Sequence, residues 1–194
     1  MKQSFINMGF TDYVTDYTLL DPWLAYGIAK KDLEDGSTLV LIVARGTDSG
    51  REFISNLNVH GLTNNRHKGF SDAANSLQNS LADFLGTNNF NDTKFKYVLT
   101  GHSRGAAATN LLAANLIDSG VQTNNIVAYN FACPDVEKMI DDKAEALQYS
   151  SIFNIGNCND FVTWVPSIVF EDGNRSDGEA YWNKYGKSYW YSEN

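Results

Sequence analysis

The sequence predicts an α/β fold in one domain, with a mostly parallel central sheet that is flanked by helices and begins with an antiparallel hairpin. Short apolar runs of strand length alternate along the chain with segments of helical periodicity, which is the pattern of right-handed βαβ units. Near the amino terminus, two apolar runs are separated by Asp35-Gly36, a pair typical of tight hairpin turns. The length of 194 residues suits one domain, which we expect to cover 1–194.

The first half of the chain contains the hairpin and two candidate helices. The hairpin strands are expected at 23–30 and 37–44, because both runs are apolar and flank the turn. Residues 51–57 have the apolar spacing of a short helix, which is either a lid or a surface helix packed on the core. A longer amphipathic helix is expected over 73–85, with Ser71 as its cap.

The second half continues the alternation of strands and helices. A buried strand is expected at 97–100, followed by a helix after Ser103 that Ser119-Gly120 ends. Further strands are expected at 125–132 and 151–156, with a crossover helix over 136–147 between them. The last segment, 179–191, is aromatic and alternating, which indicates a late hairpin or an edge strand.

The pentapeptide Gly-His-Ser-Arg-Gly, of the form G-x-S-x-G, places Ser103 between the strand at 97–100 and the helix that follows. This strand, turn and helix form a nucleophile elbow, which exposes a serine hydroxyl above a parallel sheet. Gly101 and Gly105 lie where strand and helix must approach closely, so side chains there would force them apart. The alternative is that Ser103 only caps the helix, which explains neither glycine.

The sequence offers two candidate carboxylates for a catalytic triad. Asp160 follows a strand two along from the elbow strand, so it projects from the same carboxyl edge of the sheet as Ser103. Asp135 follows the intervening strand and is the rival, although it can simply start the next helix. We favour Asp160, because the acid usually follows the later strand when the order is Ser, Asp, His.

Composition excludes several classes of function. The net charge of −8 and a pI near 4.7, without a cluster of lysine and arginine, argue against binding to nucleic acid. No apolar run is long enough to cross a membrane, and the first residues lack a signal-peptide core, so secreted and cytoplasmic locations both stay open. The two cysteines, Cys133 and Cys158, form no metal cluster, and we expect no metal or cofactor. Both follow predicted neighbouring strands, where they form either a disulfide or two buried thiols.

Taken together, the motifs resemble the class 3 lipase family, the fungal-lipase-like branch of the α/β-hydrolase fold. Five blocks occur in family order: LIVARGTDS, HKGF, VLTGHSRGA, VAYNFACPDV and NDFVTWVP. The resemblance implies that Ser103 is the nucleophile and Asp160 the triad acid. It also implies an oxyanion hole formed by Thr47 and the backbone N–H of Arg104. Many members have leucine at the position of Arg104, whose side chain either pairs with Asp48 near the site or braces the oxyanion loop.

The resemblance also implies a catalytic histidine after Asp160, and none follows it here. The three histidines are His60, His67 and His102. His67 matches a structural histidine of the family, His102 is expected to point into the fold, and His60 is most simply a loop residue. Because a serine hydroxyl needs a base, we expect that the chain is incomplete at its carboxyl end and lacks the triad histidine.

The leading hypothesis is a serine ester hydrolase of the lipase or esterase type that acts on acylglycerols or other carboxylic esters through an acyl-enzyme on Ser103. The alternative is a non-catalytic lipid-binding or interaction module on a hydrolase fold that lacks the histidine. The expected partner is a small ester or lipid, with contact to a lipid interface. The aromatic residues near the carboxyl end also predict self-association.

Overall fold

A computed structural model describes residues 1–18, 24–46, 62–63, 65–139, 147–165 and 181–192. The helices in these ranges are α1 (Lys2–Asn7), α3 (Lys68–Leu85) and α4 (Arg104–Asp118), with the short 3₁₀ helices η1 (Thr123–Asn125), η2 (Leu147–Tyr149) and η3 (Phe161–Trp164). The strands are β1 (Asp12–Asp16), β2 (Tyr26–Asp32), β3 (Thr38–Ala44), β4 (Leu62–Thr63), β5 (Arg66–His67), β6 (Phe95–His102), β7 (Ile126–Phe131), β8 (Glu137–Met139), β9 (Ile152–Asn157), β10 (Tyr181–Asn183) and β11 (Lys187–Tyr191).

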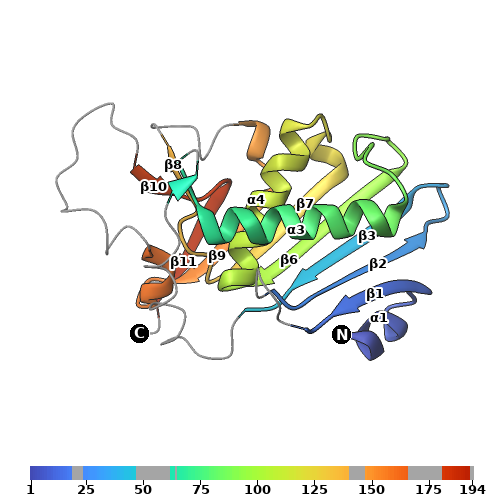
Figure 1. The fold of residues 1–194 in the computed structure, drawn as a ribbon, viewed down its shortest axis with the longest axis horizontal. Helices are drawn as coiled ribbons and strands as arrows, with labels where there is room; N and C mark the ends of the chain where they lie inside the picture. Colours follow the sequence, from blue (N-terminus) through green and yellow to red (C-terminus); the bar gives the residue numbers. More distant parts are fainter. Residues whose placement is uncertain (19–23, 47–61, 64, 140–146, 166–180, 193–194) are drawn as a thin grey trace.

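The main sheet has seven strands in the order β1-β2-β3-β6-β7-β9-β11 (Figure 1). Strands β1, β2 and β3 are antiparallel, and the pairs from β3 to β11 are all parallel. Gly36 forms the turn between β2 and β3 with a φ of +81°, a conformation that glycine adopts without strain. These observations confirm the predicted sheet and its antiparallel hairpin.

Helices α3 and α4 pack together on one face of the sheet, and α1 covers part of the other face. Strand β3 shows the division, because Val40 and Ile42 join the core formed with α3 and α4, which contains Leu77 and Leu111. The alternate residues of β3 instead pack against a smaller cluster around Phe5 of α1. Burial of each such large apolar side chain stabilises the fold by about 1.5–3 kcal/mol.

A second sheet has four strands in the order β10-β8-β5-β4. Its strands correct the predicted crossover helix and the predicted late hairpin. The helix expected over 136–147 is wrong in its described part, where β8 pairs antiparallel with β5 and β10. Glu137 and Met139 are buried while Lys138 between them is half-buried, which is the period of a strand. An ion pair of 2.6 Å between Arg66 and Glu137 joins β5 to β8. Residues 140–146 lie outside the described part.

The prediction of a late hairpin over 179–191 is also wrong, because the two strands of this segment belong to different sheets. Strand β10 pairs with β8, whereas β11 joins the main sheet parallel to β9. Gly186, with a φ of +90°, turns the chain between them. The alternative interpretation of this segment as an edge strand is confirmed for β11, and its aromatic residues Tyr189, Trp190 and Tyr191 are 43–55% exposed.

Several smaller predictions differ from the structure. Helix α1 and strand β1 were not expected, and α3 begins at Lys68 with His67 as its N-cap instead of at Ser71. Helix α4 ends at Asp118, with Ser119 as its C-cap, as predicted. The cysteines are free, with Cys133 buried and Cys158 exposed, so the structure contains no disulfide between them. The predicted helix over 51–57 lies outside the described residues.

Candidate active site

Ser103 lies at the sharp turn between β6 and α4, as the pentapeptide predicts. Its φ of 54° and ψ of −125° are strained for a residue with a side chain, and such strain persists only where the surrounding structure holds it. The two glycines explain how the turn fits. A Cβ on Gly101 would overlap the backbone of Gly105, and a Cβ on Gly105 would overlap the carbonyl group of Ala44 on β3. Strand and helix therefore touch through their backbones.

The Ser103 side chain is half-buried and does not cap the helix. Ser103 occupies the N-cap position of α4, but its side chain forms no capping hydrogen bond, while its backbone N–H donates to the Phe131 carbonyl oxygen at 2.9 Å. The interpretation of this serine as a simple cap is therefore wrong. Its hydroxyl group lies at the amino end of a 15-residue helix, where the helix dipole favours negative charge.

The expected oxyanion hole is described only in part. Arg104 is the first residue of α4, where backbone N–H groups point out of the helix end, and the residue is buried, with 8% of its surface exposed. Gly46, which follows β3, packs on the elbow, because a Cβ there would lie 3.1 Å from the Cβ of Ser103. The next residue, Thr47, lies outside the described residues, and so does Asp48.

The two candidate acids have different surroundings. Asp160 is half-exposed at the N-cap of η3, and its carboxylate accepts a hydrogen bond from the Val162 backbone N–H at 3.0 Å. Asp135 is 6% exposed and forms an ion pair of 2.9 Å with the buried side chain of Lys184. It does not begin a helix. Lys184 has no recognisable signal in the sequence, since it is one lysine in an aromatic segment.

Ser103 and Asp160 share the carboxyl edge of the main sheet, at the ends of β6 and β9 with β7 between them. No hydrogen bond joins the two residues in the described structure. Of the histidines, His67 is buried with its ring centroid 4.3 Å from that of Phe70. His102 is exposed at the end of β6, so the expectation that it points into the fold is wrong. His60 lies outside the described residues.

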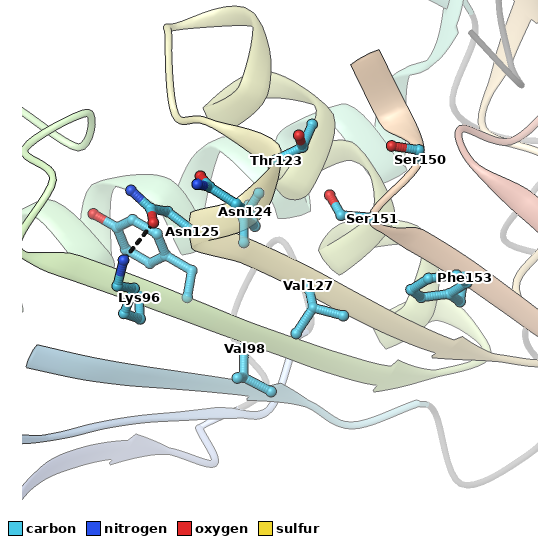
Figure 2. A pocket seen from close by; sticks show the side chains of 11 residues that line it. Lys96, Val98, Thr123, Asn124, Asn125, Val127, Ser150, Ser151 and Phe153 are labelled. Atoms are coloured by element: carbon cyan, nitrogen blue, oxygen red, sulfur yellow. Dashed lines mark hydrogen bonds between the residues drawn. The ribbon is translucent and has the colours of Figure 1, made fainter. Parts of the chain in front are cut away.

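A pocket of about 510 Å³ lies where the parallel strands of the main sheet begin, at the end opposite to the strand ends that carry Ser103 and Asp160 (Figure 2). Its walls come from the first residues of β6, β7 and β9 and from η1, and Lys96 in it donates a hydrogen bond of 2.5 Å to Asn125. Ser103 follows the carboxyl end of β6. This pocket is therefore remote from the elbow and is not part of the candidate active site.

The described ranges contain neither a candidate metal site nor a candidate membrane-spanning helix. In those ranges, no group of three or more histidine, cysteine, aspartate or glutamate side chains is placed to hold a metal ion. None of the helices described there is both long enough and apolar enough to cross a membrane.

The parallel sheet, the strained serine between its central strand and the following helix, and the carboxylate two strands along define the α/β-hydrolase class of folds. The family model for Lipase (class 3) matches residues 41–170. The chain belongs to the class 3 lipase family, which confirms the resemblance that the five sequence blocks indicate.

Comparison with known proteins agrees with this assignment. The chloroplastic phospholipase A(1) DAD1 of Arabidopsis thaliana is 26% identical over 176 residues, and the match covers 77% of this chain and 39% of that protein. The lipase of Rhizomucor miehei in its propeptide complex superposes with a TM-score of 0.64 at 23% identity, covering 92% of this chain and 57% of that one.

A lipase from Rhizopus microsporus var. chinensis superposes with a TM-score of 0.64 at 19% identity, covering 96% of this chain and 70% of that one. At these identities the structural likeness shows the fold. The chain spans 39% of the phospholipase and 57% of the Rhizomucor miehei lipase. The expectation that the domain is incomplete at its carboxyl end stays a prediction.

Proposed function

We propose that this protein is a carboxylic ester hydrolase of the lipase type, with Ser103 as its nucleophile. One observation carries the proposal: the strained elbow holds a serine whose hydroxyl is not used as a cap, at the amino end of α4. Backbone strain at a residue whose side chain does not cap the helix is typical of a catalytic position. Membership of the class 3 lipase family supports the same conclusion.

In the proposed reaction, the Ser103 Oγ attacks the ester carbonyl carbon and its proton passes to a base. The negative charge that develops on the carbonyl oxygen is stabilised by the backbone N–H of Arg104 together with Thr47. The C–O bond of the ester then breaks, the alcohol leaves with the proton, and an acyl-enzyme remains on Ser103. Water hydrolyses the acyl-enzyme by the same steps and releases the carboxylic acid.

Asp160 is the proposed triad acid, and its surroundings support that role better than those of Asp135. A triad acid must hold a protonated base by accepting a hydrogen bond from it. Asp160 is half-exposed, and among the described residues only the Val162 backbone N–H donates to its carboxylate, which leaves acceptor capacity there. The Asp135 carboxylate is buried against Lys184, whose charge it balances.

The proposed substrates are glycerolipid esters. A relative of this chain is named as a phospholipase A(1), and a protein of similar structure is named as a triacylglycerol lipase. Both substrate classes contain a carboxylic ester on a glycerol backbone, so one nucleophile serves either. Ser103 is half-exposed at the carboxyl end of the central strand β6, a position that suits a substrate entering from a lipid surface.

The test is covalent labelling of the intact chain with a fluorophosphonate, followed by intact-mass spectrometry. We expect one adduct on the wild-type protein and on Ser119→Ala, which removes a serine at the far end of α4. The adduct is expected to form slowly, because no histidine among the described residues is hydrogen-bonded to Ser103. We expect none on Ser103→Ala. Equal labelling of the Ser103→Ala variant would contradict the proposed nucleophile.

A second candidate function is a lipid-binding module without catalysis. The observation that favours it concerns the two histidines that the structure describes: His67 is buried against Phe70, His102 is exposed, and neither forms a hydrogen bond with Ser103 in the described structure. This candidate predicts no adduct on folded protein but retention on phosphatidylcholine vesicles in a flotation assay. Labelling at Ser103 would exclude it.

A further inference from the structure

Lys184 lies in the short connection between β10 and β11, where the chain passes from the four-stranded sheet to the main sheet. The residue is 4% exposed, and its ammonium group is 2.9 Å from a carboxylate oxygen of Asp135. The same group donates to the carbonyl oxygens of Cys133 at 2.9 Å and Thr163 at 2.7 Å. An ammonium group has three N–H donors, so these oxygens use all of them.

The three oxygens come from two separate loops at the edge of the sheet that carries Ser103. Cys133 and Asp135 follow β7, whereas Thr163 belongs to η3, which follows β9. A buried charge is costly unless it is paired and hydrogen-bonded. Because the Lys184 ammonium satisfies this condition only when both loops surround it, it fastens the loops to each other.

Thr163 connects this arrangement to the proposed acid. Its hydroxyl donates to the carbonyl oxygen of Asp160 at 2.6 Å, and its own carbonyl accepts from Lys184. Its backbone N–H also donates to the Asp160 carbonyl oxygen, at 3.2 Å. Lys184 therefore acts on the backbone of Asp160 through one intervening residue.

The position of Lys184 is itself fixed relative to the helix that starts at the elbow. The backbone N–H of the next residue, Tyr185, donates to Asn110 of α4 at 3.1 Å. The Asn110 amide in turn donates to the Tyr185 carbonyl oxygen at 2.8 Å. A continuous set of contacts thus runs from α4, which begins after Ser103, through Lys184 to the backbone of Asp160.

The indole ring of Trp190 lies over the ammonium group, and a second indole ring stacks on Trp190. The Trp190 ring centroid is 5.4 Å from the Lys184 nitrogen, and Trp164 stacks on Trp190 at 5.1 Å with an angle of 6° between the rings. A cation is attracted to the face of an indole ring. The ion pair is also shielded from water, since Lys184 is 4% and Asp135 6% exposed. Exclusion of water strengthens the electrostatic contacts of Lys184.

We propose that Lys184 is a positioning residue, which fixes the Asp160 carboxylate relative to Ser103 by fastening the loops after β7 and β9. The inference rests on the proposed function, in which Asp160 is the triad acid. A role in folding alone would change stability but not the reactivity of Ser103 in the folded protein.

The test uses the double variant Asp135→Asn/Lys184→Met, which removes both buried charges so that neither stays unpaired. Lys187→Met, an exposed lysine of β11, is the matched control. Two quantities are measured on the intact chain: amide hydrogen exchange at Val162 and Thr163, and the saturation kinetics of Ser103 labelling by a fluorophosphonate.

In the double variant, we expect amide exchange at Val162 and Thr163 to be about tenfold faster or more, and exchange at the amides of β6 to be unchanged. We expect the limiting labelling rate to fall about tenfold or more at an unchanged half-saturating concentration, since misplacement of a catalytic group slows the chemical step. The Lys187→Met control changes neither quantity. A second variant, Thr163→Val, keeps the shape of a buried side chain, removes the hydroxyl bond to Asp160 and gives the same two changes.

The outcomes separate the two proposals. Unchanged amide exchange in the folded variants overturns the inference, and so does faster exchange with an unchanged limiting rate of labelling. If the wild-type protein is not labelled at Ser103, the proposed function fails, and amide exchange alone decides whether Lys184 fastens the loop.

Discussion

At Gly105, a single methyl group is expected to disturb the elbow. Alanine normally stabilises a helix by about 0.5–1 kcal/mol relative to glycine. Here a Cβ would overlap the Ala44 carbonyl, which belongs to a central strand and cannot move aside. We expect Gly105→Ala to lower the free energy of unfolding by about 1–3 kcal/mol, measured by urea denaturation. A variant as stable as the wild-type protein, as helix propensity alone predicts, would contradict this contact.

Single residues differ in how far the sequence reveals them. Ser103 and its two glycines are neighbours in the chain, so the pentapeptide predicts the turn and the strand and helix beside it. The Lys184–Asp135 pair joins residues 49 positions apart in sequence, and no local pattern links a lysine among aromatic residues to a particular carboxylate. Long-range pairs of this kind depend on how the strands are ordered, which propensity does not determine.

One buried asparagine of β9, Asn154, joins this strand to α4, to β7 and to the connection between β10 and β11. The Asn154 amide nitrogen donates to the Tyr185 carbonyl oxygen at 2.9 Å, and its amide oxygen accepts from Asn110 at 3.0 Å and Asn130 at 3.2 Å. We expect Asn154→Ala to lower the free energy of unfolding by about 1–3 kcal/mol, because the buried Asn130 amide loses the oxygen to which it donates and an unpaired buried polar group costs about that much.

The matched control is Asn157→Ala at the end of the same strand. Its side chain accepts a hydrogen bond of 2.9 Å from the backbone N–H of Asn159 in an exposed position, and such bonds contribute little. We expect a change within about 0.5 kcal/mol in thermal or urea unfolding. Equal losses in the two variants would show that the buried network contributes nothing specific.

Among the elements, long periodic segments were predictable and short ones were not. The helix at α3 and the strands β3, β6, β7 and β9 have enough residues for a clear pattern. Strand β8 has three residues, and the apolar spacing over 136–147 resembles a helix as well as a strand. Its partners, β5 and β10, are equally short and far apart in sequence, so pairing in space decides its conformation.

The whole molecule is expected to lose stability at alkaline pH through Cys133. Burial raises the pKa of this thiol from 9.0 to about 12. Between these values the unfolded chain is ionised and the folded chain is not, so the unfolded state binds fewer protons and stability falls as pH rises. One such group contributes a slope approaching about 1.4 kcal/mol per pH unit above pH 9. Burial raises the pKa of Tyr97, Tyr149 and Tyr185 as well, which steepens the loss at higher pH.

Charge repulsion in an acidic protein also grows with pH, so the thiol contribution needs its own control. The measurement is the free energy of unfolding in urea from pH 8 to 10.5 for the wild-type protein, Cys133→Ala and Cys158→Ala. Cys158 is exposed, and its removal is expected to leave the pH slope of the wild-type protein in place. Cys133→Ala is expected to lower stability at every pH through the cavity it leaves. Its stability should fall less steeply between pH 9 and 10, because the variant lacks the thiol that ionises in the unfolded chain but not in the folded one. Identical slopes for the two variants would mean that repulsion, and not the buried thiol, governs the alkaline limit of the fold.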